Sequence, residues 1–315
     1  MTLRAATDRY LAWKRSRGED CRTVGSILLR YSRSAGEALG SGDATSAHVL
    51  AFLADAPSAT QRAVRHSTLN CFYRYAIRHR LADSSPLPAR SPQVPAAAPA
   101  YIYTPDDMRR LLDEIPSQTK PACRMASLTF RTLLLVLYGT GLRRSEALGL
   151  KMRDVDTGNA LLTVRNAKFS KTRLVPLGPD LVRVVTDHVG WAGRCAKGNS
   201  DDPHLFTSRD GAPLRPDTVT HAFGRLRRAA GVRRNDGAYF QPRLHDFRHT
   251  FAVRRLTSWY REGADVQRLL PCLSTYLGHS SIAATQVYLT MTPELLEEAA
   301  GRFERFVTAA PDTDA

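Results

Sequence analysis

The stretch LHDFRHTFA occupies residues 244–252 and places two histidines and an arginine among apolar residues at helical spacing. His245 and Arg248 are three residues apart, so a helix over 244–261 presents both side chains on one face. His245 and His249 are four residues apart, a spacing that also suits a pair of metal ligands. The segment lacks the H-E-x-x-H pattern and has no obvious third ligand, so we do not predict a metal site.

Two further segments lie on either side of this one. Residues 277–288 read LGHSSIAATQVY, where Tyr288 follows His279 by nine residues and a helix over 281–289 is expected. Residues 139–150 read GTGLRRSEALGL, where Arg143 directly follows a glycine turn that ends an apolar helix over 126–138. Neither segment is informative alone, because the chain has 11 tyrosines and an arginine after a turn is commonly just an exposed charge.

A β-hairpin is predicted between the arginine segment and the histidine segment. Residues 161–165 and 172–176 read as two short strands, and the loop that joins them contains Lys168 and Lys171. Only six of the 45 basic residues are lysines, so a third of the lysines fall in this one loop. Considered in isolation, the loop is most simply explained as a solvated turn.

Taken together, these segments resemble the tyrosine recombinase (phage integrase) family. GLRRSE resembles the first arginine box, KFSKTRLVPL the hairpin, LHDFRHTFA the His-x-x-Arg box and LGHSSIAATQVY the last box with its tyrosine. The resemblance covers residues 101–290, and all six functional positions carry the residues usual in the family. These positions are Arg143, Lys168, His245, Arg248, His279 and Tyr288.

The resemblance implies a reaction at a DNA phosphodiester, with Tyr288 as the nucleophile. Arg143 and Arg248 would supply fixed donors to the non-bridging oxygens, where negative charge gathers in the transition state. A metal ion fills that role in other enzymes, so neither a metal nor any other cofactor is expected. A tyrosine hydroxyl has a pKa of about 10 and needs activation and alignment for in-line attack.

The other three residues are implied to transfer protons and to hold the phosphate. His245 is the base or the orienting group, Lys168 is the general acid for the departing 5′ oxygen, and His279 donates a hydrogen bond to the phosphate. The product would be a 3′-phosphotyrosyl link and a free 5′-hydroxyl, and attack by another 5′-hydroxyl would reverse the step. Because the bond energy stays in the covalent intermediate, no nucleotide is needed, and the sequence has no P-loop signature.

The family fold is a C-shaped clamp of two domains, mainly α-helical with a small antiparallel β-sheet. Residues 1–83 show apolar residues at helical spacing, and residues 84–99 hold five of the 18 prolines, which is typical of a linker. The tail after Tyr288 either docks on a neighbouring protomer or packs on its own domain. We expect a helical, SAM-like core-binding domain at 1–85, a linker at 86–100, a catalytic domain at 101–290 and a tail helix at 291–315.

The charge of the chain favours a polyanionic partner. The net charge is +15, with 14 basic against 7 acidic residues in 1–93 and 31 against 23 in 101–315. Neutralising phosphates with such an excess releases counterions and drives binding, although a genome-wide preference for arginine would give a similar composition. The residues expected to contact DNA outside the catalytic set are Arg62, Arg65, Arg74, Lys171 and Arg173.

The resemblance also implies the partners and the location of the protein. Double-stranded DNA is the expected partner, bound by a homotetramer on two sites, with related recombinases or DNA-bending proteins as further partners. The sequence has no apolar run long enough to span a membrane and no secretory signal, so a bacterial, nucleoid-associated cytoplasmic protein is expected. Five scattered cysteines indicate reduced, buried thiols instead of disulfides or a zinc site.

Two features depart from the usual pattern of the family. Residues 254–273 form a longer connection than usual between the last two boxes, and Phe169 stands where small residues are common. The long connection is more similar to recombinases of mobile elements than to Xer recombinases. Two alternatives remain open: a type IB-like topoisomerase that relaxes DNA, and a DNA-binding protein without catalysis, which the complete set of six residues disfavours.

Overall fold

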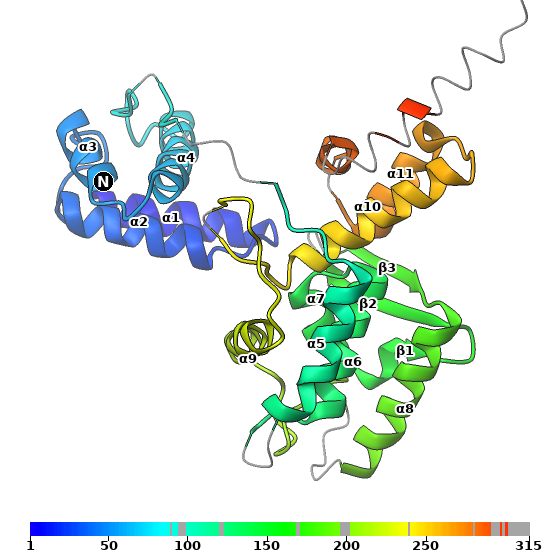
Figure 1. The fold of residues 1–315 in the computed structure, drawn as a ribbon. Helices are drawn as coiled ribbons and strands as arrows, with labels where there is room; N and C mark the ends of the chain where they lie inside the picture. The colour runs from blue at the N-terminus through cyan, green and yellow to red at the C-terminus, as the bar shows by residue number, and fades with distance from the viewer. Residues whose placement is uncertain are drawn as a thin grey trace, which may run out of the picture. The chain divides into compact units, whose positions relative to one another are not determined.

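The computed structural model describes residues 1–88, 90–93, 99–119, 123–167, 171–195, 202–238, 240–279, 281–290, and positions 297, 300 and 301. The chain divides into two compact units, Met1–Ala97 and Ala98–Ala315 (Figure 1). Lys168, Phe169, the side chain of Lys171 and nearly all of the expected tail helix lie outside the described residues.

In the described part of the first unit, four helices surround one core. They are α1 (Leu3–Ser16), α2 (Arg22–Ala35), α3 (Ser46–Ala54) and α4 (Ala59–Arg78). The Ser58 hydroxyl caps α4 by accepting from the backbone N–H of Gln61, which satisfies one of the free donors at the helix start. Aromatic rings fill the core, and the buried hydroxyls of Tyr31 and Tyr73 lie 2.8 Å apart, so each provides the partner that burial requires of the other.

The second unit combines helices with one small sheet. Its elements in chain order are α5 (Pro105–Gln118), α6 (Ser127–Thr140), α7 (Arg144–Gly149), η1 (Met152–Asp154), β1 (Val155–Asp156), β2 (Leu161–Ala167), β3 (Lys171–Pro176), α8 (Pro179–Cys195), α9 (Pro216–Ala229), α10 (Asp246–Arg261), α11 (Val266–Leu277), α12 (Ala283–Gln286) and η2 (Val287–Thr290). The sheet has the order β1-β2-β3, with both pairs antiparallel and Thr163 opposite Leu174. The predicted hairpin, and the mainly helical fold with a small antiparallel sheet, are therefore confirmed.

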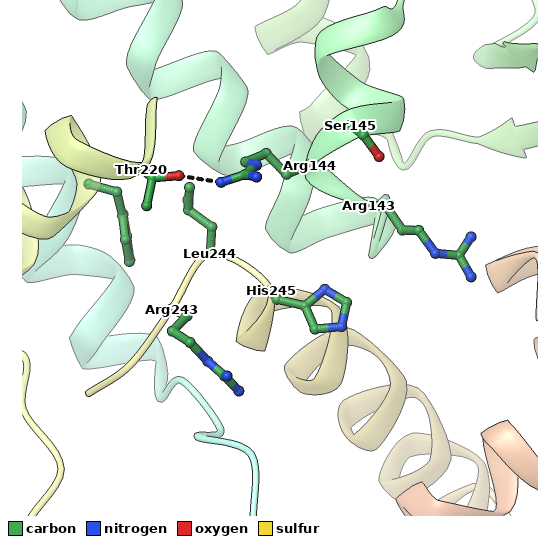
Figure 2. A pocket seen from close by; sticks show the side chains of 8 residues that line it. Arg143, Arg144, Ser145, Thr220, Arg243, Leu244 and His245 are labelled. Atoms are coloured by element: carbon green, nitrogen blue, oxygen red, sulfur yellow. Dashed lines mark hydrogen bonds between the residues drawn. The ribbon is translucent and has the colours of Figure 1, made fainter. Parts of the chain in front are cut away.

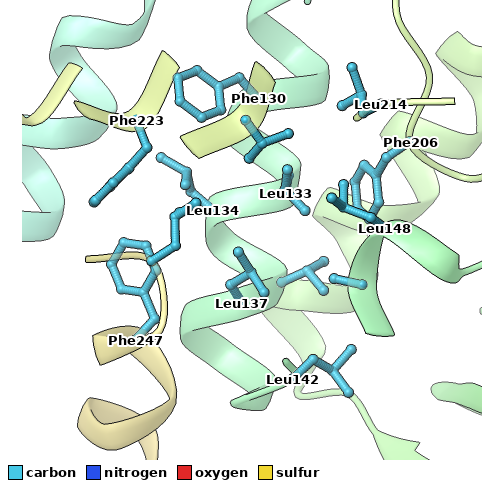
Figure 3. Packing of buried hydrophobic residues seen from close by; sticks show 14 of the residues in the cluster. Phe130, Leu133, Leu134, Leu137, Leu142, Leu148, Phe206, Leu214, Phe223 and Phe247 are labelled. Atoms are coloured by element: carbon cyan, nitrogen blue, oxygen red, sulfur yellow. The ribbon is translucent and has the colours of Figure 1, made fainter. Parts of the chain in front are cut away.

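Helix α6 forms the centre of the larger core. Its side chains Phe130, Leu133 and Leu137 are almost completely buried and contact neighbouring elements on several sides (Figure 3). Phe223 of α9 and Phe247 of α10 pack edge to face, with ring centroids 5.6 Å apart, in the same cluster. Burial of most of α6 explains why the sequence 127–140 is largely apolar, and the packing fixes the start of α10 against α6.

A separate apolar cluster joins α10, α11 and the segment that contains Tyr288. Figure 1 shows α10 and α11 side by side, and they pack through small and aliphatic residues. Tyr288 belongs to this cluster and is 3% exposed. The members of the cluster are Ala252, Val253, Leu256, Val266, Leu270, Leu273, Leu277 and Tyr288. The long connection after the His-x-x-Arg segment thus provides the support for the tyrosine.

The structure corrects several expectations. Residues 281–289 do not form one regular helix but a single α-turn followed by a 3-10 helix, and the helix α8 was not anticipated. The cysteines were expected to be buried, yet Cys71 and Cys272 are exposed and only Cys21 is buried among the thiols that the structure describes. Within the described part of the chain, none of the helices has the length and apolar character needed to cross a bilayer.

Candidate active site

Arg248 lies at the centre of the site, although it carries a charge and is only 2% exposed. Its Nη1 donates to the carbonyl of Gly141 at 2.9 Å and its Nη2 to the carbonyl of Leu277 at 2.5 Å. A buried charge is tolerated when such hydrogen bonds replace water. Burial, followed by the repulsion from Arg143, lowers the pKa of Arg248 to about 10, so the guanidinium still keeps its proton at neutral pH.

Two glycines bring backbone carbonyls to the arginines. Gly141 ends α6 with φ 64° and Gly278 ends α11 with φ 67°, a left-handed conformation that glycine adopts without strain. The carbonyl of Gly278 accepts from Nη2 of Arg143 at 3.0 Å. A Cβ atom on Gly141 would lie 2.7 Å from the ring of Phe251, so the close approach also requires glycine.

Glu146 holds two arginines in fixed positions. It accepts from Nη1 of Arg143 at 2.9 Å and from both terminal nitrogens of Arg173, at 3.1 and 2.8 Å. Burial alone would raise the pKa of this carboxyl, but the hydrogen bonds from Arg173 and Arg143 outweigh it and keep the pKa below its ordinary value. Nε of Arg173 donates to the carbonyl of Tyr276 at 2.8 Å. The carboxylate therefore connects α7, strand β3 and the end of α11.

Tyr288 is enclosed by two imidazole rings. The His279 ring stacks on it at 5.9 Å between centroids and 27° between planes, and the His249 ring meets it at 5.5 Å and 65°. Burial raises the pKa of Tyr288, while the charge of Arg248 and a hydrogen bond with its guanidinium lower it. The phenol is therefore held beside the most buried cation of the site, in a fixed orientation.

The pKa of each of the three histidines described in the site lies below its ordinary value, which favours the neutral imidazole at pH 7. Burial and the charge of Arg248 lower the pKa of His245, and burial together with the nearby arginines lowers the pKa of His279 to about 4. Burial and His245 lower the pKa of His249 to about 4. Nδ1 of His279 lies 2.8 Å from the Thr285 hydroxyl, which fixes the plane of its ring. A neutral His245 can accept a proton, as a base requires.

Comparison with known proteins agrees with this arrangement. Residues 102–294 match the model of the Phage integrase family. The protein y4rB of Sinorhizobium fredii, named as an integrase/recombinase, is 36% identical over 96% of this chain and 98% of its own length. The tyrosine recombinase XerC of Alcanivorax borkumensis is 32% identical over 70% of this chain and 66% of its own. The chain belongs to the phage integrase family.

Solved structures show the same fold over both units of this tyrosine recombinase. The integrase of transposon Tn1549, in complex with transposon right end DNA, has a TM-score of 0.70 at 18% identity and covers 98% of this chain and 100% of its own. A lambda integrase dimer bound to a COC′ core site has a TM-score of 0.62 at 21% identity and covers 90% and 96%. At these identities the likeness concerns the fold.

The recombinase has an open groove directly beside this site. The groove has a volume of about 420 Å³, and Arg143 and His245 form part of its wall. Figure 2 shows that Arg144 and Arg243 also line it. The full lining consists of Arg143, Arg144, Ser145, Thr220, Phe223, Arg243, Leu244 and His245. Arg144 and Arg243 were not singled out in the sequence, although each lies within two residues of a predicted catalytic position.

The structure brings five of the six predicted catalytic residues into one site and leaves Lys168 outside the described residues. It corrects two predicted DNA contacts. Arg65 is 3% exposed and donates to the Phe52 carbonyl at 2.6 Å, and the side chain of Arg173 is 10% exposed and bound to Glu146. Both side chains therefore bind groups inside the protein instead of facing solvent. Arg62 and Arg74 are exposed on α4 and remain predictions.

Proposed function

We propose that this recombinase cuts and rejoins duplex DNA at specific sites with Tyr288 as its nucleophile. The observation that carries the proposal is the position of the Tyr288 hydroxyl beside the buried guanidinium of Arg248. A phosphate held by Arg248 would lie next to the attacking oxygen. Positioning a nucleophile and its target in this way supplies much of the rate enhancement of a two-reactant step.

The reaction consists of two balanced transesterifications. Oη of Tyr288 attacks phosphorus, forms an Oη–P bond and passes its proton to the neutral imidazole of His245, while the P–O5′ bond breaks. The departing O5′ takes a proton from Lys168. A 5′-hydroxyl of another strand then attacks the phosphotyrosine and passes its proton to Lys168; a new P–O5′ bond forms, the Oη–P bond breaks, and Tyr288 takes back the proton from His245. The number of phosphodiester bonds is unchanged, so the two steps need no external energy source.

Arg143, Arg248 and His279 stabilise the transition state in this proposal. Arg143 is fixed by Glu146 and Gly278, and Arg248 by two carbonyls, so neither guanidinium has to reorganise when charge develops on the phosphate. His279 adds a hydrogen bond from a ring that Thr285 holds in place.

The same proposal assigns roles to the two units of the chain. The first unit, with Arg62 and Arg74 exposed on α4, is the core-binding domain, and Ala98 onward is the catalytic domain. The protein works as a tetramer on two DNA sites in the nucleoid of a bacterial cell. A solved structure of lambda integrase is a tetramer bound to a Holliday junction, and its likeness to this chain supports the assembly. A relaxing topoisomerase is not favoured, because the relatives are named as recombinases or integrases.

The test is covalent trapping on nicked duplex DNA that carries the ends flanking the gene of this protein. The wild-type protein should form a protein–DNA adduct that survives denaturation, and Tyr288→Phe should form none while binding the same DNA within about threefold. An adduct of equal yield on the Phe variant would show that another residue is the nucleophile. Tyr276→Phe is a matched control, since Tyr276 belongs to the same unit and its hydroxyl has no role in the proposal.

A further inference from the structure

Three arginines line the groove beside the active site. Arg143 and Arg144 are adjacent in the chain, yet Figure 2 shows their guanidinium groups directed to opposite sides of the start of α7. Arg144 donates to the hydroxyl of Thr220 on α9. The pair thus provides cations both at the catalytic site and inside the groove.

Arg243 provides the second groove cation, and several contacts hold it. Its guanidinium lies over the ring of Phe240 at 3.9 Å and its Nη2 donates to Oδ1 of the buried Asp246 at 3.1 Å. The backbone N–H of Arg243 donates to the other oxygen of Asp246 at 2.8 Å. The side chain nevertheless remains 50% exposed, so it is oriented in advance and still open to a ligand.

The charge around the groove is not balanced by the carboxylates that contact these arginines. Glu146 accepts from Arg143 and Arg173, and Asp246 accepts from Arg243. Arg144 contacts a neutral hydroxyl, and Arg248 contacts neutral carbonyls. The three arginines that line the groove therefore meet two carboxylates, one of which Arg143 shares with Arg173, so the groove keeps an excess of positive charge with room for an anionic ligand.

We infer that the groove binds the DNA phosphate that neighbours the scissile phosphate on the cleaved strand, through Arg144 and Arg243. This inference rests on the proposed function, because the scissile phosphate is placed by Arg143 and Arg248. Phosphates along one strand follow one another at each nucleotide, about 3.4 Å apart along the helix axis. A groove that shares Arg143 and His245 with the catalytic site is where the adjoining phosphate of the same strand would enter.

A second phosphate contact in the groove would orient the DNA strand for attack by Tyr288. Holding one phosphate fixes its position but leaves the strand free to turn about it, whereas holding two neighbours also fixes the strand direction. In-line attack by Tyr288 requires the P–O5′ bond to point away from the attacking oxygen. Arg144 and Arg243 are therefore positioning residues that act through the DNA strand.

The experiment starts from the cleavage site that Tyr288 trapping identifies, and uses the full-length protein. Fluorescence anisotropy gives the dissociation constant for duplex DNA at several salt concentrations. We expect Arg144→Ala and Arg243→Ala each to weaken binding about tenfold and to reduce the salt slope by about one. Arg183→Ala is the matched control, since Arg183 is exposed on α8 and pairs with Asp180, and it should change neither quantity. Arg243→Lys should retain the salt slope.

A second readout separates a phosphate contact from a general loss of folding. DNA duplexes with a single neutral methylphosphonate at each position around the cleavage site are bound to the wild type and to Arg243→Ala. One neutral position next to the scissile phosphate should weaken wild-type binding about tenfold and leave binding by the variant unchanged. If every neutral position weakens both proteins equally, the groove does not bind a neighbouring phosphate, although Tyr288 could still be the nucleophile. If trapping fails for the wild type, the proposed function itself is wrong.

Discussion

At the residue scale, the site depends on buried groups whose charge is set by their surroundings. His249 shows this best. Its ring lies between the rings of His245 and Tyr288, 4.9 and 5.5 Å away, and its buried Nδ1 has no hydrogen-bond partner among the residues that the structure describes. A proton on this imidazole would also meet the charges of Arg243 and Arg248, which outnumber the nearby carboxylate of Asp246. The folded protein therefore disfavours the charged form strongly.

This gives a prediction for stability against pH. The pKa of His249 is about 4 in the folded protein and about 6.5 when unfolded, so the unfolded state binds more protons between these values. The free energy of unfolding should accordingly be highest above about pH 6.5 and fall as the pH decreases towards 4. His249→Phe keeps a ring for packing and removes the titrating group. Thermal denaturation from pH 7 to 4.5 should show a smaller decrease for the variant than for the wild type, and two parallel curves would contradict the prediction.

The sequence predicted the site residues that follow one another closely, but not the surroundings that decide what an arginine does. His245 and Arg248 share a helix, and His279 and Tyr288 share a short segment, and the order and spacing of all the segments together identified them. Arg65 and Arg173 looked like exposed cations, because their acceptors, the Phe52 carbonyl and Glu146, come from other elements. The arginines of the groove went unnoticed because the groove is assembled from α7, α9 and the start of α10.

At the element scale, the site is assembled where helices end. Carbonyls at the end of a helix lack a partner within that helix. Here the carbonyls of Leu277, the last residue of α11, and of the capping glycines Gly141 and Gly278 accept from Arg248 and Arg143. A left-handed glycine follows each helix and turns the chain away, which leaves these carbonyls accessible. The glycines in GTGL and LGH are thus part of the arrangement that fixes the arginines.

We predict that Gly141→Ala disrupts both stability and cleavage. A left-handed alanine costs about 1–2 kcal/mol, and its Cβ would lie 2.7 Å from Phe251, so the carbonyl that binds Arg248 must move. Cleavage in single-turnover conditions should slow at least tenfold, with a lower thermal midpoint. Gly149→Ala is the control, because a Cβ there would meet nothing within 4 Å. Equal effects of the two substitutions would show that the geometry at Gly141 is not needed.

Elements were predicted correctly where the local signal was strong. The hairpin has β-branched residues in its strands and a polar loop, and α10 has regular apolar spacing. Helix α8 went unpredicted because its sequence, PDLVRVVTDHVGWAGRC, is rich in valine, which favours strands. Its helical form is stabilised by packing against α6, where Val185 is fully buried, and by the His188 ring, whose Nε2 is 2.9 Å from the Leu205 carbonyl.

At the scale of the whole molecule, each of the two units has its own hydrophobic core. The core of the first unit includes Leu28, Leu69 and Phe72, and none of its residues belongs to the clusters of the second unit. Each unit therefore has the buried apolar surface that a domain of its size needs. In the proposed function, one unit binds DNA and the other also carries the chemistry.

Separate cores predict separate unfolding. Leu69 is fully buried in the first unit, so Leu69→Ala should cost about 2–5 kcal/mol through lost apolar contacts and a residual cavity. In differential scanning calorimetry, the transition of the first unit should move to lower temperature while that of the second stays in place. Leu133→Ala in α6 is the reciprocal variant, since Leu133 is fully buried in the core of the second unit, and it should shift only the other transition. If either variant moves both transitions together, the two units unfold as one, and substitutions in the first unit would then reach the catalytic residues through stability as well as through DNA binding.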